Sequence, residues 1–300
     1  MRAVTAYKYP LQSRLRRALI RCGYHSKPRL LIIGAQKAGT TALFYYLADH
    51  PDIIPAREKE IGFFSPEGFA ALPQHPHHLI LCPSTGCIYS DRTAYAKAAA
   101  WYHDFFPLPH DLGRHRLTFE ATPEYLYYPD APRRIFRYEP AMKLIVLLRD
   151  PVERAFSAWN MYHNFDDPIY SQIRDTRSFH EAITAELAEI AEGNDTHLPH
   201  YVRRGLYAEQ LLRYFKIFKR EQVFVTDSRL LKTDTATLLN AIAEFLGLAP
   251  FPDGGGTRHP MHVGRYETGA PSESVQLLRA FYRTHNQKLY GLLNYDFGWP

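Results

Sequence analysis

Residues 30–41 read LLIIGAQKAGTT, an apolar run followed by a loop that contains two glycines. The apolar run predicts a buried strand, and the pattern after the loop predicts a helix that begins at Thr40. A strand, a glycine-containing loop and a helix in this order form a cradle for phosphate, because backbone N–H groups and the positive helix end attract anions. The stretch therefore predicts an anion site of the P-loop type.

The loop departs from the usual P-loop pattern, G-x-x-x-x-G-K-[ST]. Gly34, Gly39 and Thr41 fit this pattern, but Thr40 takes the position of the lysine, and Lys37 lies inside the loop instead. A nucleotide triphosphatase uses the lysine that follows the second glycine. A lysine within the loop suits a donor whose leaving group is a phosphate, with the transferred group beyond it. The alternative is an ordinary glycine turn with a lysine on the surface.

A second candidate phosphate site is RDPVERAFS, which follows the apolar run KLIVLL. Its proline favours a helix that begins at this point. Arg149 at the strand end and Ser157 on the helix can converge on one anion, because a guanidinium donates several hydrogen bonds in a fixed fork. The alternative pairs Arg149 with Asp150 or Glu153. Asp150, the acidic candidate for holding Mg²⁺ in an ATPase, stands between arginine and proline, so ATP hydrolysis is disfavoured.

Short apolar runs alternate with helical patterns along the chain. The runs that read as strands are 30–33, 116–119, 143–148 and 222–226. The helical patterns are 40–49, 95–105, 132–138, 152–162, 179–191, 206–219, 235–246 and 272–293. This alternation predicts an α/β, P-loop-like three-layer fold, in which helices flank a central parallel sheet. Residues 65–92 and 250–271 are expected to be long loops, and residues 29–300 a single domain.

The composition bounds the class of protein. The chain has 300 residues, 46% of them hydrophobic, which is enough for a substantial core. A net charge of +5 and a pI near 9.0 favour anionic ligands, and no basic run beyond the N-terminus argues for nucleic acid. Three cysteines argue against a disulfide-stapled secreted domain, although a Cys82–Cys87 pair stays open.

Residues 1–28 are expected to form a basic helical extension. Leu11, Leu15 and Leu19 fall on one helical face among arginines, so the helix is expected to pack on the domain surface. The alternative is peripheral contact with anionic membrane lipid. The segment lacks the apolar core of a signal peptide, and no run approaches the roughly 18 apolar residues of a membrane span. We therefore expect a cytoplasmic location, although a fragment of a longer anchored protein would look the same.

Taken together, the two phosphate motifs resemble those of sulfotransferases that use 3′-phosphoadenosine 5′-phosphosulfate (PAPS). GAQKAGTT is similar to the family's 5′-phosphosulfate loop, and RDPVERAFS to its 3′-phosphate site. Other segments resemble the heparan sulfate sulfotransferases: EKEIGFF (58–64), WYHDFFP (101–107), TFEATPEYL (118–126), APRRI (131–135), RGLYAEQLLRYF (204–215) and FYRTHNQKLYGLLNYDFGW (281–299). The resemblance covers most of residues 29–299 and implies sulfuryl transfer that needs no metal.

The resemblance also implies roles for individual residues. Those implied in holding the 5′-phosphosulfate are Lys37, Ala38, Gly39, Thr40 and Thr41. Those implied in binding the 3′-phosphate or adenosine are Arg149, Ser157, Arg265 on a late loop and, less directly, Tyr207 and Arg203, for which helix packing is the alternative. Lys37 would stabilise the leaving phosphate, and Glu60 matches the glutamate that serves as general base. The alternative for Glu60 is a surface glutamate paired with Lys59.

One departure from the family concerns the acceptor side. The heparan group usually has a lysine after the glutamate of the segment matching FEATPEY, where this chain has Ala121. Thr122 or an arginine from another loop is expected to substitute, or the acceptor differs. Glu120 is a candidate for acceptor binding, and His163 a fallback base or else a partly buried helix histidine. The arginines that could line a groove for an acidic polysaccharide are Arg57, Arg92, Arg133, Arg134 and Arg204.

The sequence thus predicts an enzyme that moves a sulfuryl group from PAPS to a carbohydrate hydroxyl and releases 3′,5′-ADP. N-sulfation of an amino sugar, sulfation of a small metabolite, a P-loop nucleotide kinase and a non-catalytic module that binds a nucleotide or an anionic glycan remain as alternatives. A zinc site is disfavoured, because the spacing of the candidate ligands fits no tight pattern. Those candidates are His75, His77, His78, Cys82 and Cys87.

Overall fold

The computed structural model describes residues 14–64, 92–113, 116–165, 173–195, 199–252 and 269–300, with the backbone alone for 92–94. The predicted long loops at 65–92 and 250–271 therefore lie almost entirely outside the described residues. The same is true of residues 1–13 at the start of the expected N-terminal extension.

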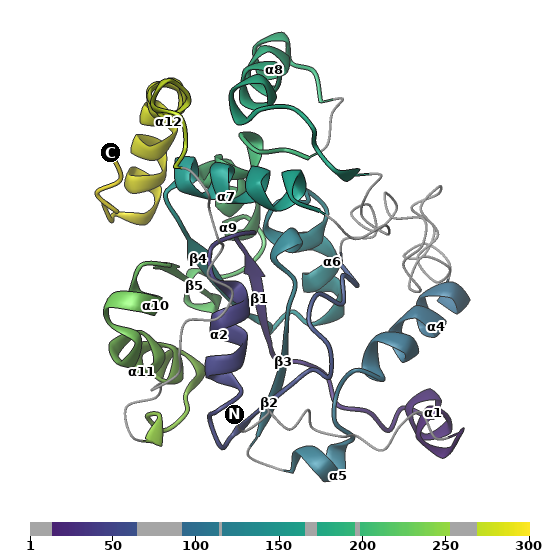
Figure 1. Cartoon of the computed structure of the whole chain (residues 1–300). Coiled ribbons are helices and arrows are strands. Elements are labelled where there is room, and N and C mark those ends of the chain that lie inside the picture. The colour runs from purple at the N-terminus through teal and green to yellow at the C-terminus, as the bar shows by residue number, and fades with distance from the viewer. Residues whose placement is uncertain (1–13, 65–91, 114–115, 166–172, 196–198, 253–268) are drawn as a thin grey trace.

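A five-stranded parallel sheet forms the centre of the molecule (Figure 1). Its strands are β1 (Leu30–Gly34), β2 (Ile53–Pro55), β3 (Leu117–Ala121), β4 (Lys143–Leu148) and β5 (Val223–Asp227), in the order β2-β3-β1-β4-β5. The predicted parallel sheet is confirmed, with strand ends within two residues of those expected. β2 was not predicted, because three residues that end in proline are too short to show a period.

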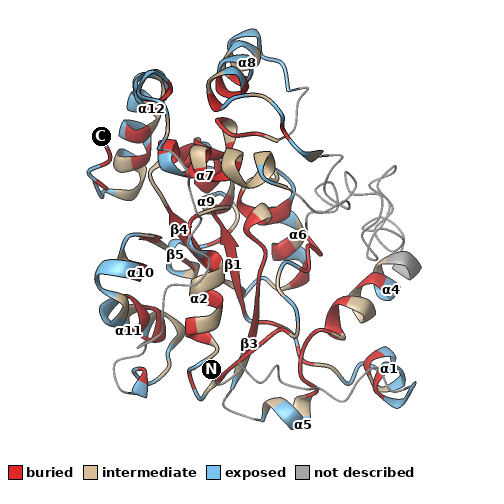
Figure 2. Ribbon diagram, viewed as in Figure 1, coloured by how far each residue is buried: buried red, intermediate tan, exposed pale blue. Residues whose placement is uncertain are grey.

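Helices cover both faces of this sheet or pack against the helices that do (Figure 1). They are α1 (Arg14–Arg21), α2 (Thr40–Leu47), α4 (Arg92–His103), α5 (Pro109–Leu112), α6 (Ala131–Tyr138), α7 (Pro151–His163), α8 (Phe179–Glu192), α9 (Tyr207–Phe215), α10 (Leu230–Thr233), α11 (Thr235–Leu246) and α12 (Ser272–Leu293). Short 3₁₀ turns are η3 (Pro123–Leu126), η5 (Arg203–Gly205) and η6 (Arg220–Gln222). The strands are buried on both sides, which explains why they read as continuous apolar runs (Figure 2).

The direction of the connections between strands reverses beside β1. The chain leaves β1 through α2 toward the β2 edge, whereas β3 and β4 connect toward the β5 edge. Right-handed crossovers in opposite directions place α2 on one face and α6 and α9 on the other. In such sheets, ligands bind outside the carboxyl ends of the strands where the direction reverses. Both predicted phosphate motifs follow strands that border this point.

The N-terminal helix α1 packs on the domain, but with a different face from the one its leucines suggested. Leu15 is 69% exposed, whereas Arg16 and Ile20 are buried. The Arg16 guanidinium donates to the Asp104 carboxylate at 2.8 Å and to the Phe106 carbonyl at 2.5 Å, so a buried ion pair fixes the helix to the end of α4. Among the described helices, none is long and apolar enough to cross a bilayer.

Candidate active site

The loop after β1 is shaped to hold an anion. Gly39 has a left-handed conformation (φ 88°) at the start of α2, and a Cβ there would lie 2.7 Å from the Leu231 side chain. The first N–H groups of a helix have no acceptor within the helix. In α2, whose first turn begins with Thr40 and Thr41, no capping side chain accepts from them either. Ala38 and Thr40 are buried. The residues predicted for the 5′-phosphosulfate thus form one compact cradle with the properties that a phosphate requires.

Lys37 lies inside this loop in a left-handed conformation (φ 68°). Its Nζ lies 3.5 Å from the Met161 sulfur on α7, which is a weak acceptor. Burial lowers the pKa of Lys37, the positive charge of Arg149 lowers it further, and the negative charge of Glu60 opposes them. The net effect of burial and of these charges favours the neutral amine, and an incoming anion would favour the ammonium.

Arg149 connects the second motif to this loop. Its Nη1 donates to the Lys37 carbonyl at 3.1 Å, and Nε and Nη2 contact the Glu153 carboxylate at 3.1 and 3.0 Å. The pairing with Glu153 that the sequence left open is therefore present together with the contact to the loop. Asp150 caps α7 by accepting from the Val152 and Glu153 N–H groups at 2.7 and 3.2 Å, which gives it a role other than holding Mg²⁺.

The remaining described cofactor candidates differ in position. Ser157 is buried on α7, in the same helix that Asp150 caps. Tyr207 is 1% exposed, and its hydroxyl donates to the Arg149 carbonyl at 2.9 Å, so it holds the backbone of the second motif in place. Burial raises its pKa. Arg203 contacts the Asn194 carbonyl and, at 3.7 Å, the Asp195 carboxylate, so its side chain is directed toward the end of α8.

Glu60 lies on the segment that runs alongside the end of β3. It has a left-handed conformation (φ 64°), and its N–H donates to the Ala121 carbonyl at 3.0 Å. Its side chain is 51% exposed and pairs with Lys59 at 2.6 Å, as the alternative interpretation expected. The negative charge of Glu60 nevertheless raises the pKa of Lys37, against the larger effect of burial. A general base beside a leaving-group lysine is compatible with this placement.

Glu120 and Thr122 lie at the end of β3, and both are fully buried. The Glu120 carboxylate accepts hydrogen bonds from Tyr102 at 2.9 Å, Tyr125 at 2.8 Å and Thr122 at 2.6 Å. These three hydroxyl groups occupy both oxygens, which favours a supporting role over direct contact with an acceptor. The positive charge of Lys59 lowers the pKa of Glu120, whereas burial, the larger effect, raises it.

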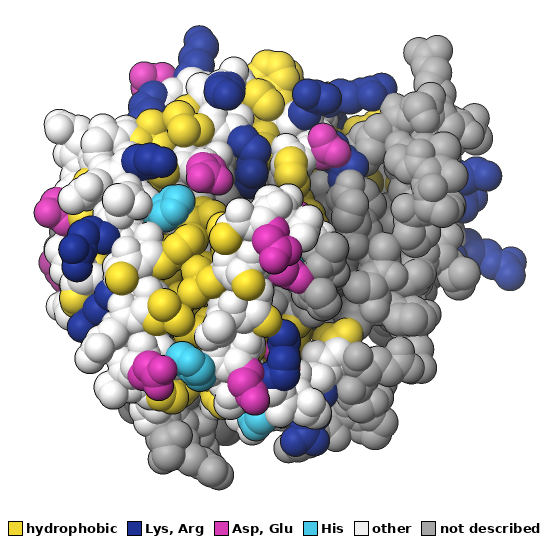
Figure 3. Space-filling model, turned by 90° about the horizontal axis from the view of Figure 1, so that it is seen from above, with side chains coloured by type: hydrophobic (Ala, Val, Ile, Leu, Met, Phe, Trp, Pro, Cys, Tyr) yellow, Lys and Arg dark blue, Asp and Glu magenta, His cyan; other side chains and the backbone are white. Residues whose placement is uncertain are grey.

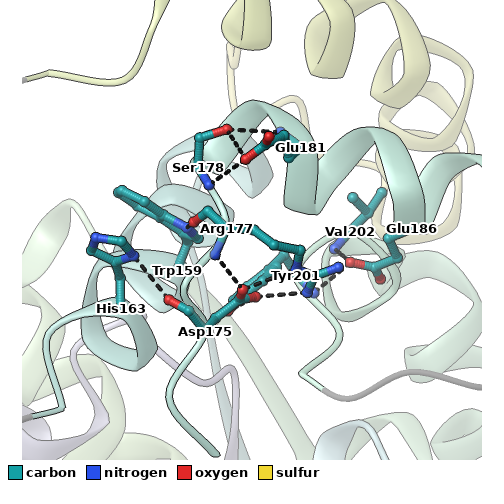
Figure 4. Close-up of polar contacts among 9 residues, drawn as sticks. All are labelled: Trp159, His163, Asp175, Arg177, Ser178, Glu181, Glu186, Tyr201 and Val202. Atoms are coloured by element: carbon teal, nitrogen blue, oxygen red, sulfur yellow. Dashed lines mark hydrogen bonds and ion pairs between the residues drawn. The ribbon is translucent and has the colours of Figure 1, made fainter.

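His163 is the last residue of α7 and belongs to a separate polar cluster (Figure 4). Its ring stacks on Trp159 with centroids 4.6 Å apart, and its Nδ1 is 2.9 Å from the Asp175 carbonyl. The Asp175 carboxylate in turn binds Arg177 at 2.7 Å and Tyr201 at 3.0 Å. These contacts fit the alternative of a partly buried structural histidine.

A buried ion pair lies next to the phosphate loop, and no local sequence pattern predicted it. Gln36 donates to Glu124 at 3.0 Å, and Glu124 pairs with Arg204 at 2.7 Å. Arg204 is 7% exposed and lies over the Tyr127 ring at 4.5 Å. The prediction that Arg204 lines an open groove is therefore wrong, because its charge is already neutralised inside the domain.

Two groups of predicted residues cannot be placed. Arg265 lies outside the described residues, and so do the candidate zinc ligands His75, His77, His78, Cys82 and Cys87. Within the part of the chain that the structure describes, no cluster of three His, Cys, Asp or Glu side chains is arranged to hold a metal ion.

Comparison with known proteins decides the family. The family model described as "Sulfotransferase family" matches residues 28–253. This chain belongs to the sulfotransferase family. Human heparan sulfate glucosamine 3-O-sulfotransferase 3B1 is 32% identical to it, over 92% of this chain and 66% of the relative. Mouse bifunctional heparan sulfate N-deacetylase/N-sulfotransferase 4 is 29% identical, over 89% of this chain but only 30% of the relative's length.

The fold of this sulfotransferase family member also matches a solved structure. A sulfotransferase from Alicyclobacillus acidocaldarius has a TM-score of 0.64 and 29% identity, over 91% of this chain and 98% of the other. Both the family and the P-loop-like three-layer fold that the sequence predicted are thereby confirmed. Figure 3 views this sulfotransferase from the side of the carboxyl strand ends, where basic, acidic and histidine side chains are interspersed around a central strip of apolar ones.

Proposed function

We propose that this sulfotransferase uses PAPS as its donor and transfers the sulfuryl group to a hydroxyl of a glycan. The observation that carries the proposal is the 3.1 Å contact between Arg149 and the Lys37 carbonyl, which joins the two segments that the sequence predicts to bind anions. A nucleotide with phosphates at both its 5′ and 3′ positions fits two such sites. A triphosphate does not require the second one.

Lys37 and Glu60 divide the chemistry between them in this proposal. Glu60 takes the proton of the acceptor hydroxyl while that oxygen attacks sulfur in line. The Lys37 ammonium stabilises the charge that develops on the phosphate oxygen as the bond from sulfur to that oxygen breaks. Stabilisation of a leaving group in a partly buried site acts mainly in the transition state. The product from the donor is 3′,5′-ADP.

A kinase is the weaker reading of the same loop. The lysine that would follow the second glycine is absent, and Asp150 is engaged as the cap of α7. Independence of turnover from Mg²⁺ separates the two activities, because phosphoryl transfer by P-loop enzymes needs the metal.

The acceptor is inferred from the relatives. The human and mouse relatives are named as heparan sulfate sulfotransferases, the human one as a glucosamine 3-O-sulfotransferase and the mouse one as an N-deacetylase/N-sulfotransferase. A net charge of +5 and exposed Arg133 on α6 favour an acidic glycan. Of the two acceptor groups we propose the hydroxyl first, because a carboxylate base suits a hydroxyl. An N-sulfated amino sugar is the second candidate.

A transfer assay with radiolabelled PAPS tests this proposal. The purified protein is incubated in EDTA with heparosan, with N-deacetylated heparosan or with chondroitin, and label in the glycan is counted. We expect label in heparosan, and a loss of about 10²-fold or more in Glu60→Gln. Label confined to N-deacetylated heparosan would establish N-sulfation instead. No label in any glycan, while 3′,5′-ADP still binds, would refute the glycan acceptor and leave the donor proposal standing.

A further inference from the structure

We infer that Glu120, acting through Thr122, is a positioning residue that fixes the segment carrying Glu60 against the end of β3. The inference rests on the proposed role of Glu60 as the base. It assigns the buried carboxylate to the geometry of catalysis and not to contact with the acceptor.

A short chain of hydrogen bonds carries the inference. The Gly62 N–H donates to the Thr122 hydroxyl at 3.2 Å, and that hydroxyl donates to Glu120 Oε2 at 2.6 Å. Two residues before Gly62, the Glu60 N–H donates to the Ala121 carbonyl at 3.0 Å. The Glu60 segment is therefore attached to β3 on both sides of Ile61. One of the two attachments passes through a side chain that Glu120 orients.

The two tyrosines on the other oxygen of Glu120 hold the same segment through their rings. Tyr102 stacks on Phe63 with centroids 4.3 Å apart and an interplanar angle of 8°. Tyr125 meets the edge of Phe64 at 5.4 Å. Because the hydroxyls of both tyrosines end on Oε1, the carboxylate determines where these rings lie. Both phenylalanines are fully buried.

The backbone of the segment needs such support. Glu60 and Gly62 both have left-handed conformations, with φ of 64° and 73°. Glu60 is not a glycine, so this conformation is unfavourable and persists only where surrounding contacts impose it. Burial raises the pKa of Glu120, while its three hydrogen bonds lower it. The three hydroxyl groups engage both oxygens of the buried carboxyl group, so each of these contacts matters to the arrangement.

The test compares Thr122→Val with Thr122→Ser. Valine keeps the shape of threonine but removes the acceptor for Gly62 and the donor to Glu120, whereas serine keeps the hydroxyl. We expect kcat of Thr122→Val to fall by about 10²-fold, because small displacements of a catalytic group have effects of that size. The acceptor KM and the affinity for 3′,5′-ADP should stay unchanged. Serine should restore most of the rate.

A second measurement keeps the result independent of activity. Amide hydrogen exchange at Gly62 and neighbouring residues should accelerate in Thr122→Val and not in Thr122→Ser. If Thr122→Val does not fold, Tyr102→Phe serves instead. It removes one hydroxyl donor to Glu120 and leaves the contact between Gly62 and Thr122 in place. Unchanged kcat together with unchanged exchange, or a rise in acceptor KM alone, would overturn the inference. Faster exchange combined with a fully active Glu60→Gln would instead retain the positioning and refute Glu60 as the base.

Discussion

The guanidinium of Arg149 donates a hydrogen bond of 3.1 Å to the backbone carbonyl of Lys37. This contact joins the end of β4 to the loop after β1, so the two phosphate motifs form one unit. Glu153 holds the same guanidinium from the other side, at 3.0 Å. If Arg149 binds the donor as we propose, its guanidinium is already oriented, which reduces the entropy lost on binding.

Lys37 should make the reaction sensitive to alkaline pH. Burial and the charge of Arg149 lower its pKa, so it loses its proton at a lower pH than an exposed lysine does. If the ammonium stabilises the leaving phosphate, kcat should fall as the pH rises through this value. Lys37→Arg, which stays charged, should be slower but should lack this alkaline limb. A pH profile of kcat for both proteins provides the measurement; the same alkaline limb in both would assign it to another group.

Arg149→Ala should weaken donor binding and not the chemical step. A hydrogen bond to a charged group contributes about 1.5–3 kcal/mol, so we expect the donor KM to rise about 10- to 150-fold. The loss should disappear for a donor that lacks the 3′-phosphate. Glu153→Gln is a matched control: its side chain is 64% exposed, and it should change the donor KM by less than about threefold. Equal losses with both donors would contradict the 3′-phosphate site.

Gly39→Ala should destabilise the protein more than Gly247→Ala. Both glycines are left-handed, with φ of 88° and 74°, so alanine costs about 1–2 kcal/mol at either position. At Gly39 the new Cβ would also lie 2.7 Å from Leu231, whereas no atom lies within 4 Å at Gly247. Overpacking adds about 1–3 kcal/mol. Urea midpoints measure the difference, and equal midpoints would mean that the Leu231 side chain moves away at no cost.

His103 should make the fold sensitive to acid. Burial lowers its pKa to about 3, and its ring stacks on His25 at 3.7 Å. In the unfolded chain this histidine has a pKa of about 6.5, so below that pH it takes up a proton only when the protein unfolds. The full stability of the folded state is therefore present only above this pH. This stability is lost as the pH falls toward 3, by about 2 kcal/mol between pH 6.5 and 5.

The variant His103→Phe isolates this effect. It should be less stable at pH 7 by about 1 kcal/mol, because the 2.8 Å contact with Tyr138 is lost. Its stability should then change less between pH 7 and pH 5 than that of the wild type. His110→Phe is the control, since that side chain is 59% exposed. Parallel pH dependence of the wild type and His103→Phe would remove His103 as the cause.

The regular elements and the loop between β1 and α2 could be predicted because their signals are local. Apolar runs located β1, β3, β4 and β5, and glycine spacing located the loop that Gly39 closes. The buried network next to the loop was not accessible in this way. Gln36 and Glu124 are 88 positions apart in the chain, and their contact exists only after the sheet forms.

Burial explains the other differences. A glutamate beside an acceptor motif reads as a binding residue, and only the packing of β3 shows that Glu120 has no exposed surface. Similarly, Arg204 reads as a groove arginine, and Leu15 as part of a buried helix face. Side-chain environment is decided by tertiary packing, which a single sequence does not encode locally. The expected cytoplasmic location and the role of Arg265 stay predictions.

Calorimetric titration with 3′,5′-ADP, 5′-AMP and ATP, all in EDTA, tests the central claim most directly. If Lys37 and Arg149 hold the two phosphate groups of one donor, 3′,5′-ADP should bind much more tightly than 5′-AMP. ATP should bind weakly and gain little from added Mg²⁺. Arg149→Ala should remove most of the preference for 3′,5′-ADP. A preference for ATP, or binding that depends on Mg²⁺, would contradict the account and favour a kinase.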